Sequence, residues 1–263
     1  MNLEDNNINS NSKPTFRSRF GRFSPSMGWK AFWSEIIIVI LGVLIALAAN
    51  EAVQNWNWQN KVLDGEARLK MDAEEVFNVL AETVVVFPCV DAQLADMAAN
   101  LLKEGNVLQP LPRYSDNFFS NYVVRYPDRN FGIPVWDTLI ADGTAIHISE
   151  SRRKNYQQIH TQLNDLNQNN TKTTTARGRF AVMAHPILLD AVVRKDLLIE
   201  IEEQRSRYKG MALSANQVMQ EIDKLQLVPK SELVDRSNQE SGTVKFCKAH
   251  NYPLADWRSY KTK

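Results

Sequence analysis

The strongest hydrophobic pattern in the chain is an unbroken apolar run near its beginning. Residues 36–49 read IIIVILGVLIALAA and contain no charge, no hydroxyl group and no proline. With its weakly polar flanks the segment 31–53 has 23 residues, and as an α-helix it would be about 34 Å long, enough to cross a bilayer. Tryptophans precede and follow it, as in the aromatic belts of membrane helices. The pattern predicts a transmembrane helix over 31–53.

The distribution of basic residues predicts the orientation of this helix. Lysine and arginine are denser close to the apolar run on its N-terminal side, where the residues are Lys13, Arg17, Arg19, Arg22 and Lys30. Basic flanks stay in the cytoplasm. We therefore expect an inner-membrane protein with a disordered basic cytoplasmic tail (1–30) and a periplasmic or otherwise extracytoplasmic C-terminal domain.

A cleaved secretory signal is the alternative reading of the same segment. Residues 46–48, Ala-Leu-Ala, resemble a signal-peptidase site after an apolar core. The 30 residues that precede the core are long for a signal peptide, and the helical pattern continues past Ala48. Both readings export the rest of the chain.

Beyond the run, apolar residues recur at helical spacing. They predict a helix from residue 51 to Phe87, a break at Pro88 and a second helix over 89–103, which together form an antiparallel hairpin. Further helices are predicted over 134–141 and from Ser149 to residue 184, the latter weak or kinked in its polar stretch 167–175. In 190–227 the apolar residues follow one another at intervals of four and three positions, which predicts a helix of a bundle or coiled coil.

These elements predict an all-α fold, in which one N-terminal transmembrane helix continues into an exported helical hairpin or bundle of long antiparallel helices. The exported domain is expected over 54–228, with an irregular aromatic loop at 106–132. Residues 229–263 are polar and lack a period, so we expect an irregular C-terminal tail.

The two cysteines, Cys89 and Cys247, both follow the apolar run. In an oxidising compartment such a pair is a disulfide candidate; the alternative is two unrelated buried thiols. Cys247 and His250 also read C-x-x-H, which is half of a zinc motif and weak without a second half.

Aromatic residues concentrate in and just after the loop 106–132. Long loops of this kind either pack on helices or line a pocket, and packing in the core is the commoner outcome. The pocket candidates are Tyr114, Phe118, Phe119, Tyr122, Tyr126 and Trp136.

One face of the apolar run carries small and polar residues at helical spacing. Small residues let two membrane helices approach closely, and polar ones bond across them, although alanine and glycine are common in such helices anyway. The candidates for a helix–helix interface are Glu35, Gly42, Ala46, Ala49 and Asn50.

Composition and motifs provide little support for other functions. The formal net charge of +1 in 263 residues gives no field that selects nucleic acid. No glycine-rich phosphate loop, G-x-S-x-G or H-E-x-x-H motif occurs. We therefore expect no enzyme, no cofactor and no metal site, although a catalytic group assembled from distant residues would escape this search.

The segment SEIIIVILGVLIALAAN, together with Phe-Pro-Cys-Val-Asp at 87–91 and Asp-Gly-Thr-Ala at 142–145, resembles an uncharacterised family of bacterial single-pass membrane proteins. The likeness covers most of the chain beyond residue 30, and the apolar segment is its most specific part. It implies an anchored, exported all-helical domain and carries no catalytic residues.

The sequence thus favours a structural or interaction protein of the bacterial envelope, which contacts the lipid bilayer and associates with itself or with another membrane protein. The alternative is a periplasmic sensory or ligand-binding module with a pocket under the aromatic loop. An enzyme of unknown type ranks third.

Intact mass distinguishes an uncleaved anchor from a cleaved signal. We expect protein purified from membranes to keep residues 1–48 and to show the mass of the whole chain, 30.0 kDa. A product that begins immediately after Ala48 would contradict the anchor.

Overall fold

The computed structural model describes residues 28–115 and 121–261, which divide into two compact units, 1–55 and 56–263. Each unit is described by itself. The described chain is mostly helical, with six α-helices and four strands of two residues each. The all-α fold class is confirmed.

The described part of the first unit consists of the beginning of helix α1, which runs over Trp29–Leu101. Its apolar segment includes an 18-residue window of mean hydropathy 2.6, and none of that window is buried. By length and composition this helix is able to cross a membrane. Its isoleucine, leucine and valine side chains lie open on all sides, from Ile37 to Leu47.

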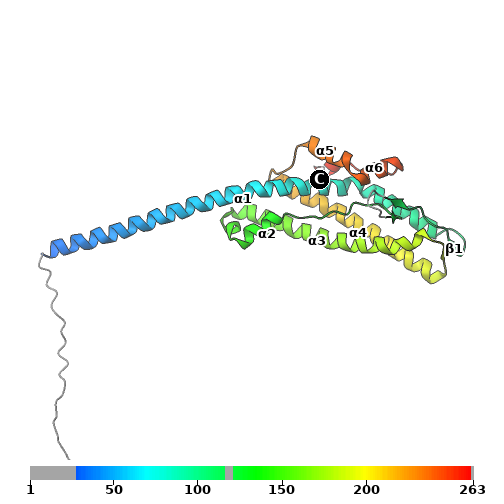
Figure 1. Cartoon of the computed structure of the whole chain (residues 1–263), viewed down its shortest axis with the longest axis horizontal. Coiled ribbons are helices and arrows are strands. Elements are labelled where there is room, and N and C mark those ends of the chain that lie inside the picture. Colours follow the sequence, from blue (N-terminus) through cyan, green and yellow to red (C-terminus); the bar gives the residue numbers. More distant parts are fainter. Residues whose placement is uncertain (1–27, 116–120, 262–263) are drawn as a thin grey trace, which may run out of the picture. The chain divides into compact units, whose positions relative to one another are not determined.

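The second unit is built on three long helices: α1 from Trp56 onward, α3 (Glu150–Phe180) and α4 (Ala191–Lys224). Helices α3 and α4 pack against each other and run antiparallel (Figure 1). The predicted apolar stripe of the last long helix is confirmed, because it is buried in α4: Ile201, Gln204, Tyr208, Met211, Ala215, Val218 and Ile222.

The predicted break at Pro88 is wrong, and with it the hairpin of 51–87 and 89–103. Helix α1 passes through Pro88 without interruption, and the neighbouring Val86, Cys89 and Val90 are fully buried. A proline removes one helical hydrogen bond and disturbs the turn before it. The bond lost here is that of the Val84 carbonyl, and the next carbonyl along the helix, of Val85, accepts the N–H of Ala255 at 2.9 Å. Tertiary contacts therefore surround the proline.

Helix α4 takes the place of the expected antiparallel partner of α1. Arg194, near the beginning of α4, donates to the carbonyls of Leu101, Lys103 (3.1 Å) and Gly105 (2.6 Å). Farther along α4, Arg205 pairs with Asp91 at 2.9 Å. A cation thus satisfies the carbonyl of the last residue of α1 and two carbonyls of the turn that follows it.

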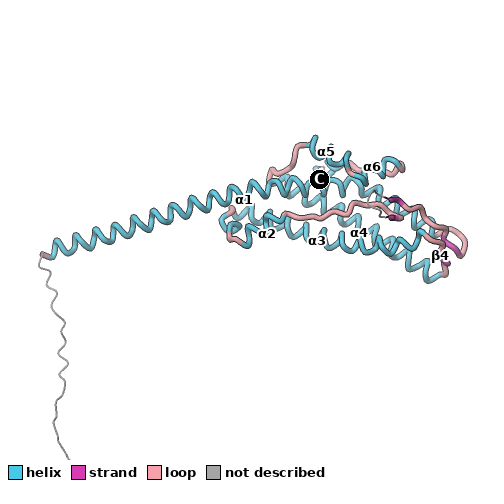
Figure 2. The backbone as a smooth tube through the Cα atoms, viewed as in Figure 1, coloured by secondary structure: helices cyan, strands magenta, loops and turns pink. Residues whose placement is uncertain are grey.

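The described residues of the segment 106–132, which exclude 116–120, contain no helix, as predicted. Strand β1 (Val107–Leu108) pairs antiparallel with β4 (Ile187–Leu188), and β2 (Tyr114–Ser115) pairs antiparallel with β3 (Asn121–Tyr122). From Val123 to Ile133 the chain is extended and lies along the helices (Figure 2).

The stretch 167–175, where a weak or kinked helix was expected, does not interrupt α3, which is continuous over Glu150–Phe180. The polar side chains there bind the extended segment. Asn167 accepts the N–H of Phe131 at 2.8 Å and donates to its carbonyl. Thr173 is buried. Tertiary hydrogen bonds therefore offset the poor helix propensity of this stretch.

Helix α2 (Pro134–Ala141) has its predicted bounds. Gly143 follows its end with a positive φ of 79°, a conformation that favours glycine. Gly65 allows α2 to approach α1, because a Cβ atom there would lie 2.8 Å from Leu139 Cδ2. The 3₁₀ helix η1 (Thr144–His147) comes next.

The prediction of an irregular C-terminal tail over 229–263 is wrong. The chain forms α5 (Ser231–Glu240), α6 (Gly242–Ala249) and the 3₁₀ helix η3 (Trp257–Lys261), all within the second unit. Phe77 of α1 makes edge-to-face contacts with Trp257 and Tyr260, at centroid distances of 5.9 and 5.7 Å. These helices are too short to show a clear period in the sequence.

Cys89 of α1 and Cys247 of α6 form a disulfide with a Cα–Cα distance of 6.0 Å. This is the pair proposed from the sequence. Both residues are fully buried, and 158 positions separate them. The bond holds α6 on α1 next to Pro88.

Replacing both cysteines by alanine should lower the free energy of unfolding by about 2–5 kcal/mol, because the bond closes a very long loop in the unfolded chain. Urea unfolding of the double variant, compared with the oxidised wild type, measures this. An unchanged midpoint would show that the disulfide does not constrain the fold.

Candidate functional site

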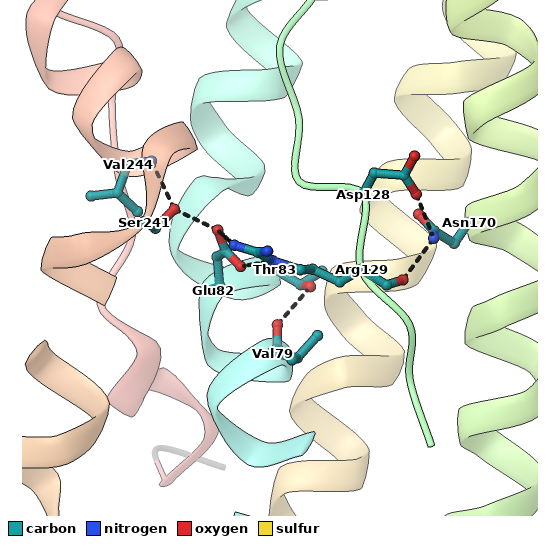
Figure 3. A network of polar contacts seen from close by, with 8 residues as sticks. All are labelled: Val79, Glu82, Thr83, Asp128, Arg129, Asn170, Ser241 and Val244. Carbon is teal, nitrogen blue, oxygen red and sulfur yellow. Dashed lines mark hydrogen bonds and ion pairs between the residues drawn. The ribbon is translucent and has the colours of Figure 1, made fainter. Parts of the chain in front are cut away.

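Two polar arrangements in the second unit are the candidates for function. The first is centred on Glu82 of α1, a carboxylate that is only 5% exposed. Arg129 of the extended segment donates to both of its oxygens, from Nε at 2.8 Å and from Nη2 at 3.3 Å. Its hydrogen bond with Glu82 raises the pKa of the Arg129 guanidinium. Ser241 donates a third hydrogen bond to Glu82 (Figure 3).

The partners of Glu82 are fixed in turn. Ser241 is the N-cap of α6 and accepts the N–H of Val244 at 3.2 Å. Asn170 of α3 donates to the carbonyl of Arg129 at 2.8 Å and to Asp128 at 3.3 Å (Figure 3). A single buried charge therefore connects α1, the extended segment and α6, and Asn170 adds α3. With its charge paired and its hydrogen bonds made, this network is suited to holding the fold.

The second arrangement is a cleft of about 300 Å³ at the C-terminal end of α1. Small ligands occupy cavities of this size or larger. Its walls come from α1 and the turn after it, from β2 and residues that flank the β2–β3 pair, and from the chain after α6. They consist of Gln93, Asp96, Met97, Ala99, Asn100, Lys103, Leu111, Pro112, Tyr114, Val123 and Tyr252.

Some polar side chains of the cleft are hydrogen-bonded to one another. Tyr252 donates to Asp96 Oδ2 at 3.1 Å, and Lys103 Nζ donates to Asn100 Oδ1 at 2.7 Å. Burial, together with the hydrogen bond to Asp96, raises the pKa of Tyr252 to about 12. Both polar atoms of the Gln93 side chain are bonded to Arg125. The amide oxygen accepts the Arg125 N–H at 2.7 Å, and the amide nitrogen donates to the Arg125 carbonyl at 2.9 Å.

An aromatic cluster supports one wall of the cleft. Phe246 of α6 contacts the Tyr114 ring edge-on at 4.6 Å and stacks with Tyr252 at 6.3 Å. His250 lies against Phe246 at 4.2 Å and Tyr114 at 5.1 Å. Both tyrosine rings are therefore in contact with Phe246.

The aromatic residues predicted to form one pocket are dispersed. Of these, Tyr114 lines the cleft, whereas Tyr126 lines a separate cavity of about 10 Å³ and donates to the Thr173 carbonyl at 2.5 Å. Tyr122 lies under the Arg177 guanidinium, 4.2 Å away.

Trp136 is buried against Tyr156, with ring centroids 5.5 Å apart, and lines neither cavity. Phe118 and Phe119 lie outside the described residues. Sequence reasoning missed the cleft residues Asp96, Lys103 and Tyr252. Asp96 and Tyr252 are 156 positions apart, and no local pattern links them.

The residues proposed for a helix–helix interface lie in the first unit. All are exposed, and a Cβ atom added to Gly42 would meet nothing within 4 Å. The proposed face, Glu35, Gly42, Ala46, Ala49 and Asn50, is thus open.

Within residues 28–115 and 121–261, no group of three or more histidine, cysteine, aspartate or glutamate side chains is arranged to hold a metal ion. Cys247 is bonded to Cys89. Its thiolate is therefore not available to form a metal-binding pair with His250.

Comparison of the chain with protein-family models, with curated proteins and with solved structures finds no match.

Arg129→Met should lower the free energy of unfolding by about 2–3 kcal/mol, because it leaves the Glu82 charge buried with only a hydroxyl partner. The value lies below that of a fully enclosed pair, since the Arg129 side chain is 47% exposed. Urea unfolding measures the effect. Adding Glu82→Gln should recover part of the loss by removing the unpaired charge.

Arg179→Met is the matched control, because Arg179 pairs with Glu200 at 3.0 Å while 68% exposed. It should cost under about 1 kcal/mol. Equal losses for the two arginine variants would show that Glu82 is not a central contact.

Proposed function

We propose that this protein is a membrane-anchored interaction protein of the bacterial envelope. The observation that carries the proposal is the apolar window of α1, whose 18 residues have a mean hydropathy of 2.6 and are all unburied. An apolar helix that is open on every side needs lipid or another apolar surface to cover it. A single transmembrane helix with its second unit outside the membrane meets that need.

The disulfide supports an extracytoplasmic second unit. Disulfides persist in oxidising compartments and are rare in the cytosol. The basic residues before the apolar segment favour the same orientation, with the N-terminus in the cytoplasm. Together they favour the inner membrane as the site of the anchor and the periplasm as the site of the domain.

The open small-residue face favours association within the membrane. Gly42 and Ala46 lie one turn apart on it, and Glu35 lies two turns before Gly42. A carboxyl group at the edge of the hydrocarbon is costly unless a partner satisfies it. We therefore propose that this face contacts a second copy of the chain or another membrane protein.

A ligand-binding or sensory module is the second candidate function. The cleft of about 300 Å³ favours it, because aromatic, carboxylate and ammonium groups converge there. The site differs from the expected pocket under the loop. Of the described aromatic residues that were predicted to line that pocket, Tyr114 lines the cleft, and Tyr122, Tyr126 and Trp136 do not.

Gly42→Leu should abolish co-purification of the membrane partner, because a leucine side chain keeps the two helix backbones apart. The measurement is a pull-down of the full chain from membranes solubilised in mild detergent. A second, differently tagged copy of the chain in the same cells detects self-association.

Ala48→Leu is the matched control, since it also enlarges a small residue of the apolar segment but lies on a different side of the helix. Its partners should be unchanged. If Gly42→Leu keeps the same partners as the wild type, association through this face is excluded.

A further inference from the structure

We propose that the cleft at the end of α1 binds a small zwitterion, with an alkylated ammonium group at Asp96 and an anionic group at Lys103. The inference rests on the second candidate function, ligand binding, and does not depend on the membrane anchor. Four features of the cleft carry it: an unpaired carboxylate, two aromatic rings, a fixed ammonium and apolar walls.

The carboxylate of Asp96 is free to bind a cation. In the described part of the chain it makes no ion pair, and its side chain accepts one hydrogen bond, from the Tyr252 hydroxyl. That bond holds the carboxylate at the cleft wall and leaves its charge uncompensated. Asp96 is also exposed, so a ligand reaches it from solvent.

The aromatic rings suit an ammonium group that carries alkyl substituents. Tyr114 and Tyr252 both line the cleft together with Asp96, and each of the two rings contacts Phe246. Aromatic faces attract cations, and alkylated ammonium ions are bound in this way because they lose little hydration. Met97, Leu111 and Pro112 provide apolar surface for the substituents.

Lys103 provides the opposite charge in the lining of the cleft. It lies two residues after the end of α1, whereas Asp96 lies within that helix. Its ammonium is fixed on Asn100 at 2.7 Å and has no acidic partner in residues 28–115 or 121–261. A ligand that joins a cation to an anion therefore matches both charges of the lining.

The same charges disfavour other ligand classes. A polyanion such as a nucleotide would meet one lysine and be repelled by Asp96. A divalent metal ion would find a single carboxylate, fewer charged oxygens than such ions prefer. The volume of about 300 Å³ restricts the ligand to a small molecule or to the head of a larger one.

Calorimetric titration of the full chain in a neutral maltoside detergent tests the proposal with four probes. Phosphocholine carries both charges, choline only the cation, and inorganic phosphate only the anion, whereas 3,3-dimethylbutan-1-ol is the neutral shape analogue of choline. We expect phosphocholine to bind most tightly, choline more weakly, and the neutral alcohol at least about tenfold more weakly than choline. Equal binding of choline and the alcohol would overturn the proposal, as would no binding of phosphocholine.

Variants assign the two ends of the ligand. Asp96→Asn keeps the shape of the side chain and an acceptor for Tyr252, and it should weaken binding of choline and phosphocholine about tenfold. Lys103→Met should reduce the affinity for phosphocholine to that for choline and leave choline binding unchanged. Tyr114→Leu should weaken both. Unchanged affinities in Asp96→Asn would overturn the assignment.

Asp165→Asn is the matched control, because Asp165 is an exposed carboxylate on α3 that does not line the cleft. It should bind all probes as the wild type does. Retention of the disulfide and of the urea midpoint shows that each variant is folded. Loss of folding in Tyr114→Leu would leave the two charge variants to decide the result.

The zwitterion has two sources, a free solute or the headgroup of a lipid. Co-sedimentation with phosphatidylcholine or phosphatidylglycerol vesicles does not separate the two sources. The anchor itself inserts into both kinds of vesicle, in the wild type and in Asp96→Asn alike. A competition experiment separates the two sources. Free phosphocholine is titrated into the protein in maltoside micelles, with and without added phosphatidylcholine. If the ligand is a free solute, phosphocholine should bind equally in both cases. Reduced binding in the presence of phosphatidylcholine identifies the lipid headgroup, and both results require an intact cleft.

Discussion

The second unit depends on the attachment of its C-terminal part to the buried stretch of α1 around Pro88. Within about two turns of α1, three different contacts are made. Glu82 accepts a hydrogen bond from Ser241, the Val85 carbonyl accepts the N–H of Ala255, and Cys89 is bonded to Cys247. Each joins residues more than 150 positions apart. A proline that would end an isolated helix is thus accommodated by distant residues.

Polar side chains on α1 and α3 hold the extended segment that follows β3. Gln93 bonds both backbone groups of Arg125, and Asn167 does the same for Phe131. Backbone groups without secondary structure need such partners when buried. The glutamine and asparagine amides provide a donor and an acceptor each, so each binds one residue as a neighbouring strand would. The polar composition of 167–175 therefore reflects what α3 binds.

Periodicity in the sequence was sufficient for the elements that bury one apolar stripe. It predicted the buried face of α4, whereas Pro134 and Gly143 marked the bounds of α2. It failed where tertiary contacts override local preference: at Pro88, in the polar stretch of α3 and in the short helices α5 and α6. The cleft was missed for a related reason. Asp96 and Tyr252 have no common local pattern, and only the attachment of the C-terminal part brings them together.

The attachment at Pro88 also positions the wall of the cleft. Tyr252 lies five residues after Cys247 and three before Ala255, and its N–H donates to the Cys247 carbonyl at 2.9 Å. Phe246, which supports Tyr114 and Tyr252, immediately precedes the disulfide. Tyr252 and Phe246 therefore belong to the segment that the disulfide fixes to α1, whereas Asp96 belongs to α1 itself and Lys103 follows its end. Because the two sides come from distant parts of the chain, the cleft takes its shape once this attachment has formed, and an oxidising compartment favours that state.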